Sequence, residues 1–202
     1  MELTGKPTAL IMAAIMTAAA LQARGADQNE TRKLAVCMDG APGPEPTVAR
    51  MTVSQMFAGI GVAIDWHTQM ADCPADALKI SLSNKTPETL RPGALAYALP
   101  YEGAHIVVFY DRIQRMGSLR SAPRVMAHVM AHEITHILEG IVRHSESGVM
   151  KARWSDDELR AMARKPLPFA AEDVDLIYTG LAYRAAHPVD AVTKAANPPA
   201  RQ

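Results

Sequence analysis

The sequence predicts a single domain of the α+β class, in which a strand, a helix and several further strands are followed by a run of helices. The chain has 202 residues, of which 49% are apolar, which is enough for one hydrophobic core and too few for two comfortable ones. Short apolar runs bounded by glycine, proline or aspartate indicate strands in the first half. Apolar residues at helical spacing indicate helices in the second half.

The first 26 residues have the composition of a secretory signal peptide. Lys6 precedes an apolar run at 9–16, which passes into the small residues Ala18 to Ala20. A membrane anchor is the alternative, but the run is shorter than the roughly 20 apolar residues that a spanning helix needs. We therefore predict a signal peptide at 1–26, one domain at 27–186, and a secreted or periplasmic mature protein without a membrane span.

The first half of the chain contains one predicted helix among predicted strands. Apolar residues recur at near-helical spacing from Val48 to Phe57 and stop at Gly59. Pro42, Pro44 and Pro46 precede this helix and predict a loop. Alternating or continuous apolar runs predict strands at 33–38, 62–66, 78–83 and 104–110, and a short edge strand within 93–99.

Helices are predicted for most of the second half. Ser121 and Pro123 open a helix that ends at Gly140, with serine as a cap and glycine as a stop. Ser155 and Glu158 form a capping-box pattern, so a short helix starts there and ends before Pro166. A last helix is predicted at 170–186, and we expect the tail 187–202 to be disordered.

The long predicted helix carries the pattern His132-Glu133-Ile134-Thr135-His136. Histidines four residues apart lie on one helix face, so both imidazoles can bind one zinc ion while Glu133 reaches a water beside it. Zinc acidifies that water, and Glu133 can act as general base. The alternative, two core or surface histidines, leaves the intervening glutamate without a use.

His128 offers a rival pair with His132, but Val129 follows His128, which leaves that pair without a base. His128 and His136 are separated by about 12 Å of helix and cannot share an ion. We expect His128 to lie beside the metal ligands or at the surface.

A catalytic zinc ion needs a third protein ligand, and His144 is the best candidate. It follows Gly140 by four residues, so a tight turn can return it to the metal. A carboxylate from a later helix or from nearer the motif is the alternative. The four candidates are Glu139, Glu146, Glu158 and Glu172.

The stretch from His132 to His144 resembles the extended metzincin motif of two helix histidines, a glycine turn and a third histidine. Residues 147–150 resemble the Met-turn, whose methionine, here Met150, forms an apolar floor under the metal. The glycine and third histidine fall four and eight residues after His136, where metzincins normally have three and six. The whole stretch is closer to small, exported, largely uncharacterised bacterial metzincin-like proteins.

The resemblance implies a zincin-like fold, with a mixed, mostly parallel twisted sheet packed on an N-terminal helix and the zinc-motif helix, and a small helical C-terminal part. It implies a zinc metalloendopeptidase with Zn²⁺ as cofactor. An extended substrate would add to the edge strand at 94–99, although an ordinary protected edge is equally compatible with that strand. Four tyrosines could donate to an oxyanion: Tyr97, Tyr101, Tyr110 and Tyr178.

Two other functional classes compete with a peptidase. A catalytically silent zinc-binding envelope or partner-binding protein would share the fold, but the retained Glu133 argues against it. The sequence contains no cysteine motif of the kind that redox or haem proteins use. The 21 basic and 21 acidic residues form no block of like charge, so we expect a peptide or protein substrate and no nucleic acid. The oligomeric state is left open.

The predicted mature chain contains two cysteines, Cys37 and Cys73. In an exported protein an even pair favours a structural disulfide, with two separate buried thiols as the alternative.

Overall fold

The computed structural model describes residues 32–38, 43–98, 104–116 and 121–187. The chain divides into two units, residues 1–32 and 33–202, and the fold described below is that of the second. The predicted signal peptide at 1–26 and the tail from 188 onward lie outside the described residues and remain predictions. Within the described residues, no helix is both long and apolar enough to cross a membrane.

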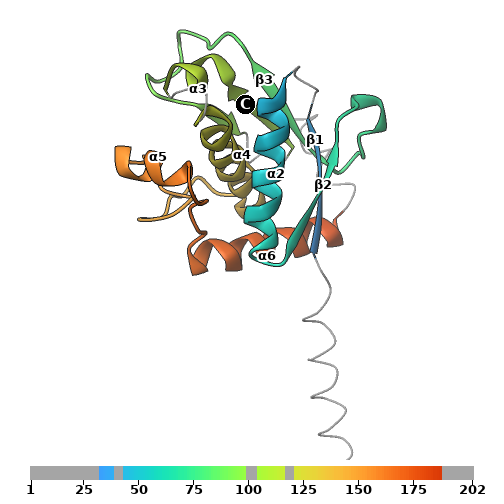
Figure 1. The fold of residues 1–202 in the computed structure, drawn as a ribbon. Helices are drawn as coiled ribbons and strands as arrows, with labels where there is room; N and C mark the ends of the chain where they lie inside the picture. The colour runs from blue at the N-terminus through green and yellow to red at the C-terminus, as the bar shows by residue number, and fades with distance from the viewer. Residues whose placement is uncertain (1–31, 39–42, 99–103, 117–120, 188–202) are drawn as a thin grey trace, which may run out of the picture. The chain divides into compact units, whose positions relative to one another are not determined.

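A sheet of five strands has the order β2-β1-β3-β5-β4 (Figure 1). Strand β3 pairs in parallel with β1 and with β5, whereas β4 pairs antiparallel with β5 and forms the edge. The strands are β1 (Arg32–Met38), β2 (Val62–His67), β3 (Leu78–Ser83), β4 (Ala96–Ala98) and β5 (His105–Phe109). The predictions of these strands and of a mostly parallel sheet are confirmed.

Five α-helices are described, and three of them, α2, α4 and α6, pack against one another through α4. The helices are α2 (Pro44–Ala58), α3 (Tyr110–Met116), α4 (Ala122–Glu139), α5 (Asp156–Met162) and α6 (Ala171–Ala186), with a short 3₁₀ turn, η1 (Met70–Asp72). Helix α4 packs against α2 on one side and against α6 on another, and it also contacts β4 and β5. The helix that carries the histidine motif is therefore the central helix of the unit.

Helix α2 starts earlier than the sequence predicts. Pro44 and Pro46 lie inside its first turn instead of in a loop, directly after Gly43. Proline is tolerated there because the first N–H groups of a helix have no intrahelical partner, and its fixed φ suits a helix. Counting prolines as loop residues was wrong at this position.

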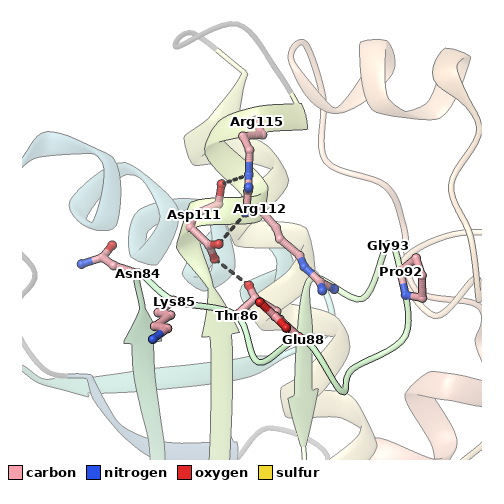
Figure 2. Close-up of a pocket in the computed structure, with 9 residues that line it drawn as sticks. All are labelled: Asn84, Lys85, Thr86, Glu88, Pro92, Gly93, Asp111, Arg112 and Arg115. Carbon is pink, nitrogen blue, oxygen red and sulfur yellow. Dashed lines mark hydrogen bonds and ion pairs between the residues drawn. The ribbon is translucent and has the colours of Figure 1, made fainter.

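Helix α3 was not predicted, because Ile113 is its one buried residue and gives no apolar periodicity. It is tied to the segment between β3 and β4. Thr86 Oγ1 donates to Asp111 Oδ1 at 2.7 Å, and Arg112 Nη1 donates to the carbonyl of Ala94 at 2.7 Å. A cavity of about 540 Å³ lies between the two segments (Figure 2). These contacts hold the chain that leads into the edge strand β4.

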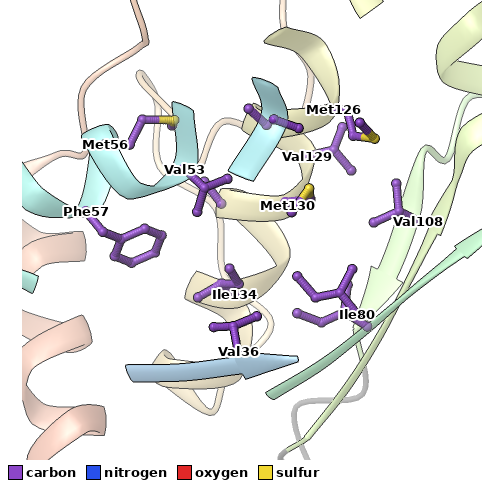
Figure 3. Close-up of a cluster of buried hydrophobic side chains, with 14 of the residues drawn as sticks. Val36, Val53, Met56, Phe57, Ile80, Val108, Met126, Val129, Met130 and Ile134 are labelled. Carbon is purple, nitrogen blue, oxygen red and sulfur yellow. The ribbon is translucent and has the colours of Figure 1, made fainter. Parts of the chain in front are cut away.

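The hydrophobic core lies between the sheet and helices α2 and α4. Figure 3 shows Val36 and Ile80 from the sheet facing Ile134 and Met130 of α4, with Phe57 of α2 beside them. All five side chains are buried. Burial of each large apolar side chain contributes roughly 1.5–3 kcal/mol, so burial of Met130 and Ile134 stabilises the position of α4.

The predicted disulfide is present in the structure. Cys37 in β1 is joined to Cys73, which directly follows η1, with a sequence separation of 36 residues. The bridge fixes the connection between β2 and β3 to the middle of the sheet. Its position supports a structural role.

Candidate metal centre

The buried apolar face of helix α4 fixes the orientation of the helix and hence the positions of the motif histidines. Met130, Ile134 and Leu138 are buried in the core. Met126 and Ile137 extend this apolar face, so the helix cannot rotate without exposing it. The helix ends at Gly140, which adopts the left-handed conformation with φ 67°. This favours glycine at the position where the chain turns back, as predicted.

The structure brings His132, His136 and His144 together. One ring nitrogen from each lies within 4.8 Å of the others. The Nε2 atoms of His132 and His136 are 3.0 Å apart. The ring centre of His144 lies 5.3 Å from that of His132 and 5.0 Å from that of His136. The glycine turn thus returns the third histidine to the first two.

Hydrogen bonding and burial leave ring nitrogens available for a metal. Nδ1 of His132 lies 2.9 Å from the carbonyl oxygen of Val149 and donates to it in the neutral tautomer, so Nε2 keeps its lone pair. Burial lowers the pKa of His132 and of His136 to about 4, and burial followed by the charge of Arg143 lowers the pKa of His144. Histidines with lowered pKa values are neutral at pH 7, which is the form that binds metal.

These residues fit a zinc ion. A tetrahedral zinc ion with Zn–N bonds of about 2.0–2.1 Å holds two imidazole nitrogens about 3.3 Å apart, close to the 3.0 Å between His132 and His136. The Nε2 atoms of His132 and His136 face each other, so without a metal a proton must lie between them. A cation between the rings uses both Nε2 lone pairs.

Glu133 lies between the two helix ligands in sequence and next to the edge strand. Burial raises the pKa of Glu133 to about 7, and a hydrogen bond from the backbone of Ala98 in β4 opposes this shift. Its carboxyl group is therefore close to β4 and can exchange a proton near neutral pH.

The residues that follow His144 form a tight turn, of which the last two residues, Val149 and Met150, are buried. The Ser145 N–H donates to the Met150 carbonyl at 2.8 Å, and Met150 is fully buried. Gly148 has φ 77°, and a Cβ atom there would meet the Pro168 carbonyl oxygen at 2.3 Å, so glycine is required. This is a turn with a buried methionine at the predicted position. That Met150 forms a floor beneath a metal remains a prediction.

The four carboxylates considered as alternative ligands lie outside the histidine group. Glu158 accepts two hydrogen bonds from Lys151 at 2.9 Å and closes the predicted capping box with Ser155. Glu172 and Glu139 pair with Arg143, at 2.8 and 3.7 Å. Glu146 is exposed.

His128 is buried, so the surface position considered for it is wrong. Its Nδ1 lies 2.7 Å from the Arg124 carbonyl, and its Nε2 accepts a hydrogen bond from the Leu167 N–H at 2.9 Å. Nδ1 thus bonds within α4, and Nε2 fastens the segment before α6 to that helix. Sequence spacing could not reveal this partner, which lies 39 residues away.

The three described tyrosines among the candidate oxyanion donors contact other parts of the fold, and of these Tyr110 packs against the hydrophobic core. Tyr178 donates to the Ile60 carbonyl, and Tyr97 packs its ring against Phe109 with centres 5.9 Å apart. Tyr101 lies outside the described residues.

None of the residues lining the cavity beside α3 belongs to the histidine group, so that cavity is a separate feature.

Sequence reasoning missed three residues that surround His144. Arg143 and Ser145 both donate to the buried carboxylate of Asp173 in the first turn of α6. The one signal in the sequence was that Asp173 occupies the third position of a predicted helix, where acidic residues often cap. Nothing in the sequence connected it to His144.

No protein-family model matches this sequence, and no curated protein matches it. Among solved structures, the chain is similar to an archaemetzincin from Methanopyrus kandleri, with a TM-score of 0.53 and 14% identity over 74% of this chain and 95% of that one. It is also similar to a zinc-dependent peptidase from Methanocorpusculum labreanum, with a TM-score of 0.52 and 14% identity over 71% of this chain and 99% of that one. At this identity the likeness concerns the fold, and the predicted zincin-like α+β fold is confirmed.

Proposed function

We propose that this chain is an exported, metzincin-like zinc endopeptidase. The observation that carries the proposal is the convergence of three neutral imidazoles beside a glutamate whose pKa is raised to about 7. A purely structural zinc site has four ligands and no dedicated base. Similarity to an archaemetzincin and a zinc-dependent peptidase supports the same reading.

His132, His136 and His144 would hold the ion. When bound there, zinc supplies a Lewis acid that acidifies water and polarises a peptide carbonyl. Glu133 then accepts the proton of the attacking water and passes it to the nitrogen of the leaving amine. Burial raises the pKa of this carboxyl group in the metal-free protein, which favours its holding a proton between the two steps.

The peptide substrate is proposed to lie along β4. This strand is the edge of the sheet, and its residue Ala98 lies beside the carboxyl group of Glu133. A peptide that pairs with β4 on the side away from β5 would therefore pass the proposed base. Met150 is proposed as the apolar support beneath the histidines.

The experiment that tests the proposal replaces Glu133 by glutamine, which keeps the size of the side chain but cannot accept the proton. The Glu133→Gln variant should retain zinc, measured by metal analysis, while cleavage of a peptide library falls by at least about a hundredfold, the low end for a positioned base. Glu146→Gln is the matched control, because this exposed glutamate follows the third histidine without joining the group.

Two outcomes would contradict the proposal. Wild-type protein that binds zinc but cleaves no peptide would favour the silent zinc-binding alternative. Equal cleavage by wild type and Glu133→Gln would show that the activity does not depend on this glutamate.

A further inference from the structure

Both neighbours of His144 in the chain bind one oxygen atom of Asp173. Arg143 Nη1 donates to Asp173 Oδ1 at 2.8 Å, and Ser145 Oγ donates to the same atom at 2.6 Å. The other oxygen, Oδ2, accepts the backbone N–H of Ala170 at 3.1 Å. Asp173 has an exposure of 0%. The carboxylate is thus fixed to the start of α6 and joins that helix to both sides of His144.

Apart from the ring contacts with His132 and His136, the His144 side chain has little else to hold it. It is exposed, and within the described residues its ring makes no hydrogen bond, whereas the ring of His132 is oriented by the Val149 carbonyl. A ligand on an exposed loop loses conformational freedom when it binds metal, and that loss weakens binding. Fixing the backbone on both sides of the ligand beforehand reduces the loss.

Asp173 differs from the other carboxylates that contact Arg143. Glu172 Oε2 lies 2.8 Å from Arg143 Nη2, and Glu139 Oε1 lies 3.7 Å from Nη1. Neither forms a hydrogen bond with Ser145 in the described part of the chain. Asp173 therefore contacts both residues flanking His144, and the two bonds meet on one atom.

We propose that Asp173 is a positioning residue for the third metal ligand: through Arg143 and Ser145 it holds His144 where it can share a zinc ion with the helix histidines. The inference rests on the proposed zinc site. An ordinary buried ion pair would stabilise the fold equally whether or not His144 is present. A positioning residue instead affects zinc affinity only when His144 is present, and this can be tested.

The test measures zinc affinity by competition with a chelator of known affinity, for Asp173→Asn alone and combined with His144→Ala. We expect Asp173→Asn to weaken zinc binding about ten- to a hundredfold, the usual effect of removing a group that orients a ligand. In the His144→Ala background the same substitution should change zinc affinity less than about twofold, because the ligand that Asp173 positions is gone. Equal losses in both backgrounds, or no loss in either, would overturn the proposal.

Two further variants complete the experiment. Asp175→Asn, an exposed aspartate on the same helix, is the matched control and should bind zinc as wild type does. If Asp173→Asn fails to fold, as judged by circular dichroism of the metal-free protein, Ser145→Ala takes its place, since it removes one donor and keeps the Arg143 pair. Ser145→Ala should weaken binding about tenfold in the wild-type background alone, and any other pattern would overturn the proposal.

The absorption spectrum of the cobalt-substituted protein gives a readout independent of catalysis. Asp173→Asn should shift the spectrum towards that of His144→Ala, because one substitution weakens the bond between cobalt and His144 and the other removes it. Wild type that binds neither zinc nor cobalt would instead refute the proposed function. Metal binding that depends on the three histidines, with no effect of Asp173→Asn, would refute the positioning role alone.

Discussion

The three candidate ligands come from two regions that are held in different ways. His132 and His136 lie on α4, whose other face is buried against α2, the sheet and α6. His144 lies on the loop from 140 to 151, hereafter the ligand loop, where Ile141 and Val142 are 43% and 67% exposed. The helix is held by apolar burial along most of its length. The ligand loop is buried only near its end, at Val149 and Met150, and its part around His144 is held by polar bonds to residues of α6.

This difference indicates how the site is assembled. Two ligands on a packed helix are in place as soon as the core forms, because their separation is set by helix geometry. The third ligand depends on contacts between residues far apart in sequence. We therefore expect the helix to determine whether metal binds and the ligand loop to adjust how tightly.

The largest expected effect is the difference between removing a helix ligand and removing the loop ligand. Zinc sites in proteins have binding free energies of about 10–16 kcal/mol, so losing one of three firmly held ligands should weaken binding on the order of a thousandfold. His136→Ala should show this loss. His144→Ala should weaken binding only about a hundredfold, the upper end of the effect of losing a group that orients a ligand, since its exposed position can be taken by water. Competition with a chelator measures the zinc affinity of both variants. Equal losses of affinity would contradict the proposed difference between the helix and the ligand loop.

A second prediction concerns the stability of the two regions without metal. Ile134 is fully buried between the motif histidines, so Ile134→Ala should lower the free energy of unfolding by about 2–5 kcal/mol. Val142→Ala, also a truncation of a β-branched side chain, should change it by less than about 0.5 kcal/mol, because 67% of Val142 is exposed. Urea unfolding of the metal-free variants provides the measurement. Similar losses would show that the ligand loop is packed as firmly as the helix.

The same division explains which features could be predicted from the sequence. The candidate helix ligands and Glu133 could be singled out because their spacing is a local property of one helix, and the structure places His132 and His136 together. The strands β3 and β5 were found because alternation and apolar runs are local too. The Gly140 turn was found because left-handed backbone favours glycine.

Features that depend on distant contacts were missed. Asp173 meets Arg143 across 30 residues, and His128 meets Leu167 across 39. Helix α3 buries a single residue and so gave no periodic signal. The Pro44 start of α2 was hidden because proline is common both in loops and in the first turn of a helix.

The smallest expected effect concerns the solvent side of the ligand loop, where Lys151 is bound by Glu158 of α5. Hydrogen bonds from Lys151 and from Ser155 lower the pKa of Glu158 to about 2, from an ordinary value of 4.5. An acid with a lowered folded-state pKa stabilises the fold fully above its unfolded value, and this contribution is lost as the pH falls from about 4.5 towards 2. The effect should be small, since water screens an exposed ion pair.

Glu158→Gln removes this titration while keeping the shape of the side chain. Wild type should therefore be slightly more stable than the variant at pH 6, and the difference should shrink as the pH falls towards 2. Asp157→Asn, in the same turn but without a bond to Lys151, is the control. Urea unfolding at pH 6, 4 and 2.5 measures the difference. If the difference in the free energy of unfolding stays constant with pH, Glu158 supports the ligand loop through packing and not through charge. The ligand loop would then be held by packing, as the helix is.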